Sequence, residues 1–276
     1  MTTRMTVHRL AGLIAAADAA AVAEAVTAQP RLVRATVEQD GDSGWTPLHL
    51  AVAAGQEAVV EVLVTAGADL SARTEDGHSP LHVALQRAPD LVPLLRRLGA
   101  PVDAASAAFL GDAGQLADAL DAGAPLTDPV PSRDLLSWAA AGSSAATVAV
   151  LLDRGADPDT GALHAAAAAG CPPVVGALLR AGAAVDRRDP HTGRTPLHTA
   201  VAALASGPTE EVIEVVRLLL DAGADVNATT NDGASALDIT RVAGARRRAG
   251  TPGDGAAGAT GPDALDRLLT AAGATG

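Results

Sequence analysis

Apolar residues recur at helical spacing in short segments that are separated by polar turns. One segment covers residues 48–52 and a second covers residues 59–63, with Gly55 turning the chain between them. Gly67 follows the second segment, where glycine commonly ends a helix in the left-handed conformation. The polar stretch 69–77 has the composition of an extended turn. The pattern predicts a pair of helices followed by a turn.

This unit is repeated along the chain. Residues 44–51 read Gly-Trp-Thr-Pro-Leu-His-Leu-Ala, and residues 77–84, 33 positions later, read Gly-His-Ser-Pro-Leu-His-Val-Ala. Residues 193–200 read Gly-Arg-Thr-Pro-Leu-His-Thr-Ala, and a reduced copy, Gly-Ala-Leu-His-Ala, occupies residues 161–165. Self-similarity at such a period indicates a stacked repeat protein.

The first helix of a clear copy carries its own start signal. Thr46 and Thr195 can cap the helix with a hydroxyl, and Pro47 and Pro196 follow at the first helical position. Proline costs nothing there, because the N–H that it lacks would have no partner within the helix.

The Thr-Pro-Leu-His-x-Ala signature at a period near 33 resembles the ankyrin repeat, a β-turn followed by two antiparallel helices. The resemblance covers nearly the whole chain. It implies an all-α ankyrin-repeat solenoid of about eight helix pairs with short β-turn or hairpin loops, whose right-angled, L-shaped repeats stack into a curved array. The Ala-rich, Lys-free composition further suggests a bacterial, high-GC source.

One ankyrin-repeat domain is therefore predicted over residues 1–276. We expect an N-terminal cap pair at 7–38, central repeats at 42–228 and a C-terminal cap repeat at 231–274. The last repeat is expected to contain a flexible loop at about 246–262, where Gly, Pro and Arg are frequent.

One repeat has a shortened leading turn. The twelve-residue gap from Gly55 to Gly67 recurs from Gly111 to Gly123, and this places a repeat at residues 107–112 with little chain before it. The missing turn should leave a notch in the series of turns along the stack.

Composition and charge restrict the function. Hydrophobic residues make up 48% of the chain but aromatic residues only 1%, which favours thin layers packed through Ala, Val and Leu. The formal charge of −12 argues against nucleic acid as a partner, because phosphate contacts need a basic face. A charged protein partner is expected to be basic. No apolar stretch is long enough to span a bilayer, so no membrane partner is expected.

The N-terminus is open to two interpretations. Arg4 and Arg9 precede an apolar stretch at 10–17, as in a secretory signal. Asp18 interrupts that stretch, and residues 19–28 continue it as an amphipathic helix rather than a cleavage site. A first helical repeat is favoured, and we expect a cytoplasmic protein.

The signature carries four histidines, which are interpreted as structural: His49, His82, His164 and His198. Metal binding would need them within about 2 Å of one ion, whereas successive repeats lie about 10 Å apart. Each neutral imidazole can instead bridge its own turn and the next repeat.

Two other candidate motifs lack the context that they need. Residues 253–258 match a dinucleotide fingerprint but lack the preceding strand, and Cys171 has no catalytic His at a recognisable spacing. We therefore predict no catalytic, cofactor or metal site.

The resemblance also implies a binding surface. In ankyrin-like proteins, the tips of the turns and the exposed sides of the first helices line a concave groove. The corresponding positions predicted to bind a partner are Asp42, Trp45, Glu75, Asp76, His78, Arg87, His191, Arg194, Asn231 and Asp232.

The two tryptophans receive different interpretations. Trp45 lies on a turn in a chain with few aromatic residues, so it could anchor an interface or pack over the neighbouring turn, and both readings stay open. Trp138 occupies a slot filled by Leu50 and Val83 in other copies, which favours packing.

These features predict a monomeric protein-binding module, without catalysis of its own, that holds a partner protein along its concave face. The alternative is a regulatory or substrate-recruiting subunit, of an inhibitor or immunity type, in an enzyme complex whose chemistry resides in the partner.

Overall fold

The computed structural model of the chain describes residues 6–39, 41–127, 134–203, 209–250 and 261–275. The chain divides into two compact units, and the division falls between Ser106 and Ala107. The sequence predicted one domain, and the boundary between the units lies in the repeat with the shortened turn. We describe each unit by itself.

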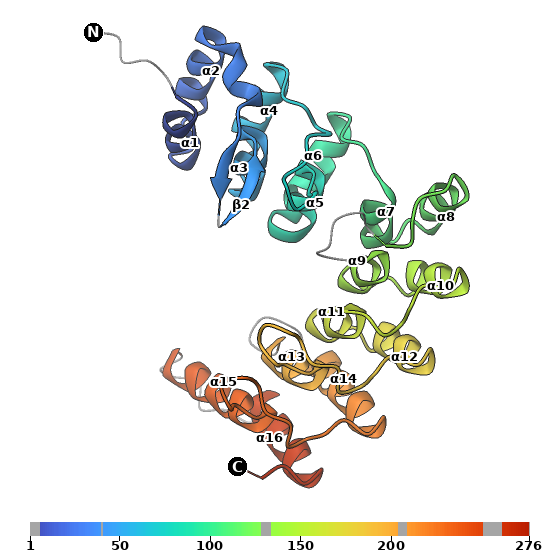
Figure 1. The fold of residues 1–276 in the computed structure, drawn as a ribbon. Helices are drawn as coiled ribbons and strands as arrows, with labels where there is room; N and C mark the ends of the chain where they lie inside the picture. Colours follow the sequence, from blue (N-terminus) through green and yellow to red (C-terminus); the bar gives the residue numbers. More distant parts are fainter. Residues whose placement is uncertain (1–5, 40, 128–133, 204–208, 251–260, 276) are drawn as a thin grey trace. The chain divides into compact units, whose positions relative to one another are not determined.

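The first unit consists of helix pairs and one hairpin (Figure 1). Its elements are α1 (Val7–Ala15), α2 (Ala19–Ala28), η1 (Pro30–Arg34), β1 (Val37–Gln39), β2 (Asp42–Trp45), α3 (Pro47–Ala53), α4 (Glu57–Thr65), α5 (Pro80–Arg87), η2 (Pro89–Leu91) and α6 (Val92–Arg97). The strands pair antiparallel, with Val37 opposite Trp45 and Gln39 opposite Asp42.

Helix α7 (Ala104–Leu110) lies at the boundary between the units. The second unit continues with α8 (Ala113–Asp121), α9 (Leu135–Ala141), α10 (Ala145–Asp153), α11 (Ala162–Ala169), α12 (Pro172–Arg180), α13 (Pro196–Ala203), α14 (Thr209–Asp221), α15 (Ala236–Gly250) and α16 (Gly261–Ala271). Within the described residues the sixteen helices form eight successive pairs, which confirms the predicted all-α repeat fold.

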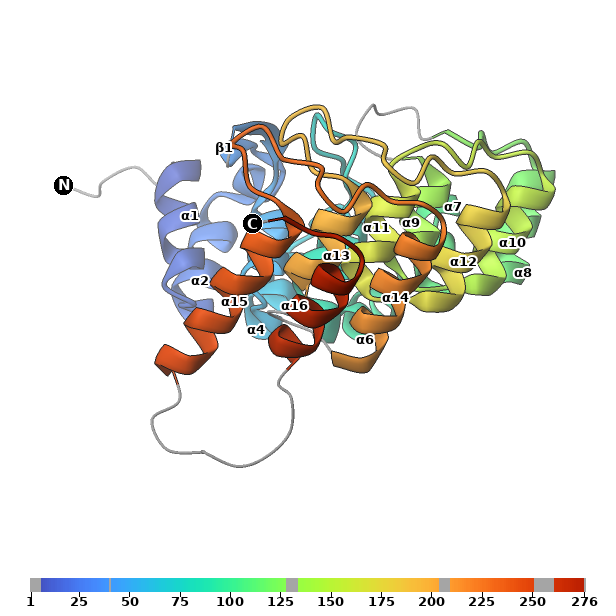
Figure 2. The ribbon, with the colours of Figure 1, turned by 90° about the horizontal axis from the view of Figure 1, so that it is seen from below.

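Each unit is built of two layers. The first helices of successive pairs contact one another, from α1 through α3 to α5 and from α9 through α11 and α13 to α15. The second helices form the other layer, in which α2 contacts α4, and α8, α10, α12, α14 and α16 follow one another (Figure 2). Small residues such as Ala51, Ala84 and Ala200 are fully buried between the layers and allow the helices to approach closely.

The predicted cap of a helix start is confirmed at Thr46, and Ser79 repeats it. In the third clear copy, α13 begins at Pro196 as predicted. Thr46 and Ser79 each accept a hydrogen bond from the backbone N–H three residues later, and proline follows at the first helical position. These caps satisfy an N–H group that the helix itself leaves unpaired.

The loop predicted at about 246–262 is too long. Helix α15 continues to Gly250 and α16 begins at Gly261, so only residues 251–260 separate them, and these lie outside the described residues. Residues 236–250 contain no proline and are rich in Ala and Arg, which are strong helix formers. No helix in the described part of the chain has the length and hydropathy needed to cross a membrane.

Candidate functional site

The turns of the first unit are held together by their backbones. Glu75 N donates to Ser43 O at 2.9 Å, which links the β1–β2 hairpin to the following turn. Gly44 has a φ of 82°, and a Cβ atom there would lie 3.0 Å from Glu75 N. Glycine is therefore required at this approach, whereas Glu75 and Asp76 keep exposed side chains.

The turns of the second unit are linked in the same way. Asn231 N donates to Thr192 O at 2.9 Å, and Asn231 Nδ2 donates to His191 O at 3.1 Å. Within the earlier turn, Asp189 Oδ1 accepts from the Thr192 hydroxyl and from two backbone N–H groups. These bonds, the hydroxyl of Thr192 first, lower the pKa of Asp189.

The signature histidines bridge successive repeats. The N–H of Thr46 donates to His49 Nδ1 at 3.2 Å, so this nitrogen is the acceptor of a neutral ring and Nε2 carries the proton. His49 Nε2 donates to His78 O at 3.0 Å, and His164 Nε2 donates to Arg194 O at 3.0 Å. These bonds confirm the predicted link to the next repeat for His49 and His164.

His198 completes only half of this arrangement. Its Nδ1 accepts from Thr195 N at 3.2 Å, but its buried Nε2 has no hydrogen-bond partner within the described residues. Burial lowers the pKa of His198; the carbonyls of Ala228 and Ala234 act in the opposite direction, although neither meets hydrogen-bond geometry with Nε2. Ala234 O already accepts from the N–H and the hydroxyl of Thr230.

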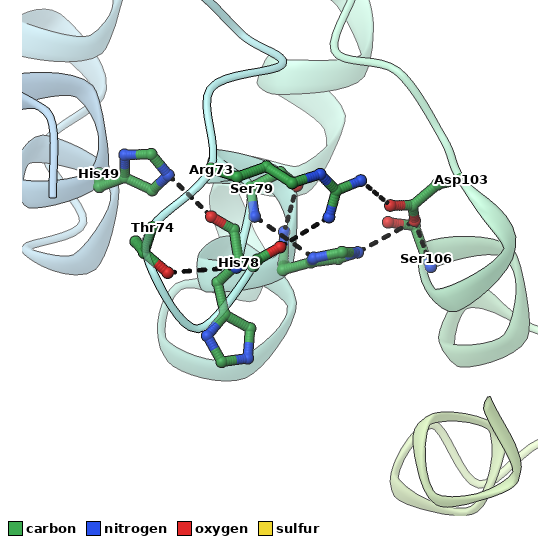
Figure 3. Close-up of polar contacts among 9 residues, drawn as sticks. His49, Arg73, Thr74, His78, Ser79, Asp103 and Ser106 are labelled. Carbon is green, nitrogen blue, oxygen red and sulfur yellow. Dashed lines mark hydrogen bonds and ion pairs between the residues drawn. The ribbon is translucent and has the colours of Figure 1, made fainter. Parts of the chain in front are cut away.

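His82 has a carboxylate as its partner, that of Asp103, whose bonds to Arg73 and Ser106 are drawn in Figure 3. Its Nε2 lies 3.0 Å from Asp103 Oδ1, and Asp103 also caps α7 by accepting from Ser106 N at 2.9 Å. Arg73 joins the cluster, because Nη2 donates to Asp103 Oδ2 and Nη1 to Gly77 O, each at 2.6 Å. The carboxylate of Asp103 thus takes the place of the carbonyl that the shortened turn does not supply.

The environment of Asp103 favours its charged form. Burial alone would raise the pKa of its carboxyl group, but the hydrogen bond from His82 acts against burial. With the additional bonds from Ser106 N–H and Arg73, the pKa of Asp103 is held well below its usual range.

Ser79, His82 and Asp103 have the residue types of a nucleophilic triad but not its geometry. The hydroxyl of Ser79 accepts from His82 N at 3.2 Å, and His82 Nδ1 accepts from Ser79 N at 3.3 Å. A nucleophile instead donates its own proton to the imidazole and must be reachable by substrate. Ser79 is 3% exposed and His82 is 1% exposed. The three residues form a helix cap and an inter-repeat bridge.

Trp45 is a packed residue of the turn, so its interpretation as an exposed anchor is wrong. It is 4% exposed, and its ring meets the ring of His49 edge-on, with centroids 5.9 Å apart. The guanidinium of Arg87 lies over the ring at 5.3 Å from its centroid. Trp138 is 1% exposed and packs edge-on against Phe109, which confirms its interpretation as packing.

The other residues predicted to bind a partner lie at or near the turns. Asp42 begins β2, but its side chain lies outside what the structure describes. His78 is half-buried and stacks edge-on against His82. Exposed side chains are found at Glu75, Asp76, Arg87, His191, Arg194, Asn231 and Asp232. Each unit brings its own members together, and a single face shared by both units stays a prediction.

Sequence reasoning missed Asp103 and Arg73. A signal was available, because Asp103 precedes Ser106 by three residues, as a capping residue precedes the residue whose N–H it accepts. Asp134 and Ser137 repeat this arrangement at the start of α9, with Ser137 N 2.7 Å from Asp134 Oδ1.

The family comparison agrees with this geometry. The family described as ankyrin repeats (three copies) matches residues 13–106 and 136–238, which is more than half of the chain. The chain belongs to the ankyrin-repeat family. Stacked repeats of this kind present extended surfaces for binding other proteins, so membership implies a role in protein–protein interaction.

Relatives in this family include regulatory proteins. The chain is 35% identical over 207 residues to the mouse B-cell lymphoma 3 protein homolog, covering 73% of this chain and 41% of that protein. It is 28% identical over 194 residues to the chicken nuclear factor NF-kappa-B p105 subunit, covering 70% of this chain and 14% of that protein. It is also 45% identical over 65 residues to mouse protein phosphatase 1 regulatory subunit 27, covering 23% of this chain and 42% of that protein.

The chain therefore spans less than half the length of each of these relatives. All three are eukaryotic and give no support to the bacterial source predicted from composition.

Proposed function

We propose that the chain binds a partner protein through its turn tips and the exposed sides of its first helices. The observation that carries this proposal is that backbone hydrogen bonds join neighbouring turns while the charged side chains of these turns are exposed. The bonds from Glu75 N to Ser43 O and from Asn231 N to Thr192 O order the backbone before any partner arrives. Such preorganisation reduces the entropy lost on binding.

The proposal includes no catalysis by the chain itself. The cluster of Ser79, His82 and Asp103 supports this view, because its donors and acceptors are used in capping and bridging. We further propose a cytoplasmic monomer that needs no cofactor and binds neither nucleic acid nor membrane, in keeping with the charge of −12.

A regulatory subunit of an enzyme complex is the second candidate. It is favoured by the similarity to a protein named as a regulatory subunit of protein phosphatase 1, which is 45% identical over 65 residues. In that case the partner would be an enzyme, and the chain would inhibit it or recruit its substrate.

Co-purification from the native host, followed by mass spectrometry, tests the binding face. Arg194→Glu reverses a charge at a turn tip, and Arg180→Glu reverses an exposed charge at the end of the second helix α12. We expect Arg194→Glu to lose at least one partner that both the unaltered protein and Arg180→Glu retain. If the two variants retain the same partners, the turn tips of the second unit are not the binding face.

The regulatory-subunit proposal needs a second test. A partner lost by Arg194→Glu should be an enzyme whose rate or substrate range changes when the purified chain is added. A partner without enzymatic activity would exclude the regulatory-subunit reading and leave the binding module in place.

A further inference from the structure

A groove lies next to the β1–β2 hairpin and to the segment that follows α4. Its volume is about 520 Å³, and it is formed by the end of η1, the hairpin and residues 67–73. This is within the range of about 300–1,000 Å³ that is typical of ligand sites. The residues that line the groove include Val33, Arg34, Thr36, Asp69, Ala72 and Arg73.

Arg34 is the cation of this groove whose side chain forms no ion pair with a described residue. It is exposed and makes no hydrogen bond or ion pair with any described residue, although it lies near enough to Asp69 to help lower the pKa of that carboxyl group. The hydrogen bonds from Ser71 are the main cause of that lowering, and both reach Asp69 Oδ1, at 2.6 and 2.8 Å.

Arg73 also lines the groove, but its positive charge is compensated by the carboxylate of Asp103. Its Nη1 donates to Gly77 O and its Nη2 to Asp103 Oδ2, and Figure 3 shows the pair of Arg73 and Asp103. The exposed Thr36 also lines the groove, and its hydroxyl has no partner in the described part of the chain. Val33 and Ala72 add an apolar wall.

We propose that this groove binds an extended segment of a partner protein and that Arg34 pairs with an aspartate or glutamate side chain of that segment. A guanidinium matches a carboxylate in charge and in planar geometry. The apolar wall and the size of the groove fit several residues of a peptide better than a small ion. This site is separate from the turn tips and would give the first unit a second point of attachment, for an acidic rather than a basic segment.

Fluorescence anisotropy with a labelled peptide tests the proposal. The probe is the peptide Gly-Leu-Glu-Leu-Gly with both ends blocked, and its counterpart has Gln in place of Glu. We expect the Glu peptide to bind the full chain at least about fivefold more tightly than the Gln peptide, since a charge-assisted bond exceeds a neutral one in strength. Equal binding of the two peptides, or no binding of either at about 1 mM, would overturn the proposal.

Variants assign the effect to the groove. Arg34→Glu should weaken binding of the Glu peptide by about tenfold. Arg31→Glu, which reverses an exposed charge of the same 3-10 helix outside the groove, should change it by less than about twofold. Asp69→Asn, which keeps an acceptor for Ser71, should strengthen binding about two- to fivefold. Equal losses in Arg34→Glu and Arg31→Glu would show general charge attraction and refute the site.

Competition separates a peptide site from an anion site. Inorganic phosphate at about 10 mM should displace little of the peptide once ionic strength is matched with chloride. Full displacement by phosphate would show that the groove holds small anions and would refute the proposed occupant. The Arg194→Glu variant should bind the peptide normally, so failure of the turn-tip proposal would leave this result unaffected.

Discussion

His82 pairs with the carboxylate of Asp103 at 3.0 Å, in the position where His49 and His164 pair with a backbone carbonyl. The repeat that Asp103 begins has a shortened leading turn, so it offers His82 no turn carbonyl. A side chain that also caps its own helix supplies the acceptor instead. One residue thus performs two functions that His78 and Ser79 divide between them one repeat earlier.

Asp103→Ala is expected to destabilise the first unit by about 2–4 kcal/mol, because it leaves the Nε2–H of His82 and the N–H of Ser106 without acceptors. Asp103→Asn, which retains one acceptor oxygen, should cost less. Urea unfolding followed by circular dichroism measures both. Asp90→Ala removes an exposed carboxylate in the same unit and should change stability by less than about 0.5 kcal/mol. A neutral Asp103→Ala would contradict the assigned role.

The stabilisation by Asp103 should depend on pH. Its folded pKa lies below the value of about 3.9 in an unfolded chain, so the unfolded state binds more protons when the pH falls into this range. The contribution is therefore complete above about pH 5 and is lost progressively as the pH falls below about 4. The stability difference between the unaltered protein and Asp103→Asn should shrink from pH 6 to pH 3. A constant difference would be inconsistent with the lowered pKa.

His198 should make the second unit sensitive to mild acid. Burial lowers its folded pKa below the ordinary value of 6.5, so the unfolded chain binds the proton more readily and stability rises with pH through this range. Its contribution is present above about pH 6.5 and is lost as the pH falls. We expect His198→Gln to reduce the loss of thermal stability between pH 7.5 and pH 5. His191→Gln, at an exposed position, should leave that loss unchanged.

Trp45→Ala should destabilise the first unit by about 3–5 kcal/mol, because it removes a large buried side chain. Arg87→Ala removes only the cation over the ring and should cost about 0.5–1 kcal/mol. Urea unfolding at pH 7 measures the two. Equal small effects would mean that the ring does not support the turn.

Gly193 should tolerate substitution less well than other glycines in the left-handed conformation. It has a φ of 68°, and a Cβ atom there would lie 2.8 Å from Asn231 N. Gly182 has a φ of 99° but has open space around the same position. Both alanine variants carry backbone strain of about 1 kcal/mol, and Gly193→Ala should cost about 1–2 kcal/mol more. Equal melting temperatures for the two variants would argue against the close contact between the turns.

The repeat fold could be predicted because its signals are local. Thr46 and Pro47 specify a helix start within two residues, and apolar spacing specifies the buried face. Burial of Trp45 could not be predicted, since its cover comes from Arg87 in the next repeat. The end of α15 was predicted too early. The glycine and proline residues that follow it indicated a loop from about residue 246, whereas the helix preference of Ala and Arg extends α15 to Gly250.

The candidate site was predictable in kind but not in detail. The turns carry exposed charges where the family resemblance places them, but sequence spacing says nothing about which turn backbones bond. The bond between Asn231 N and Thr192 O joins residues 39 positions apart, and no local pattern in either turn specifies it.

Asp103 also shows how the length of a repeat can vary while the bridge to its neighbour is kept. Twelve positions separate Gly67 from the helix cap Ser79, whereas only four separate Gly99 from the cap Asp103. An aspartate at the helix cap opposite a signature histidine can thus replace the turn carbonyl, so that the turn itself can be deleted. Transplanted to the cap of α13, opposite His164, it should allow the preceding connector to be trimmed, which offers protein engineers a way to reshape a binding surface one repeat at a time.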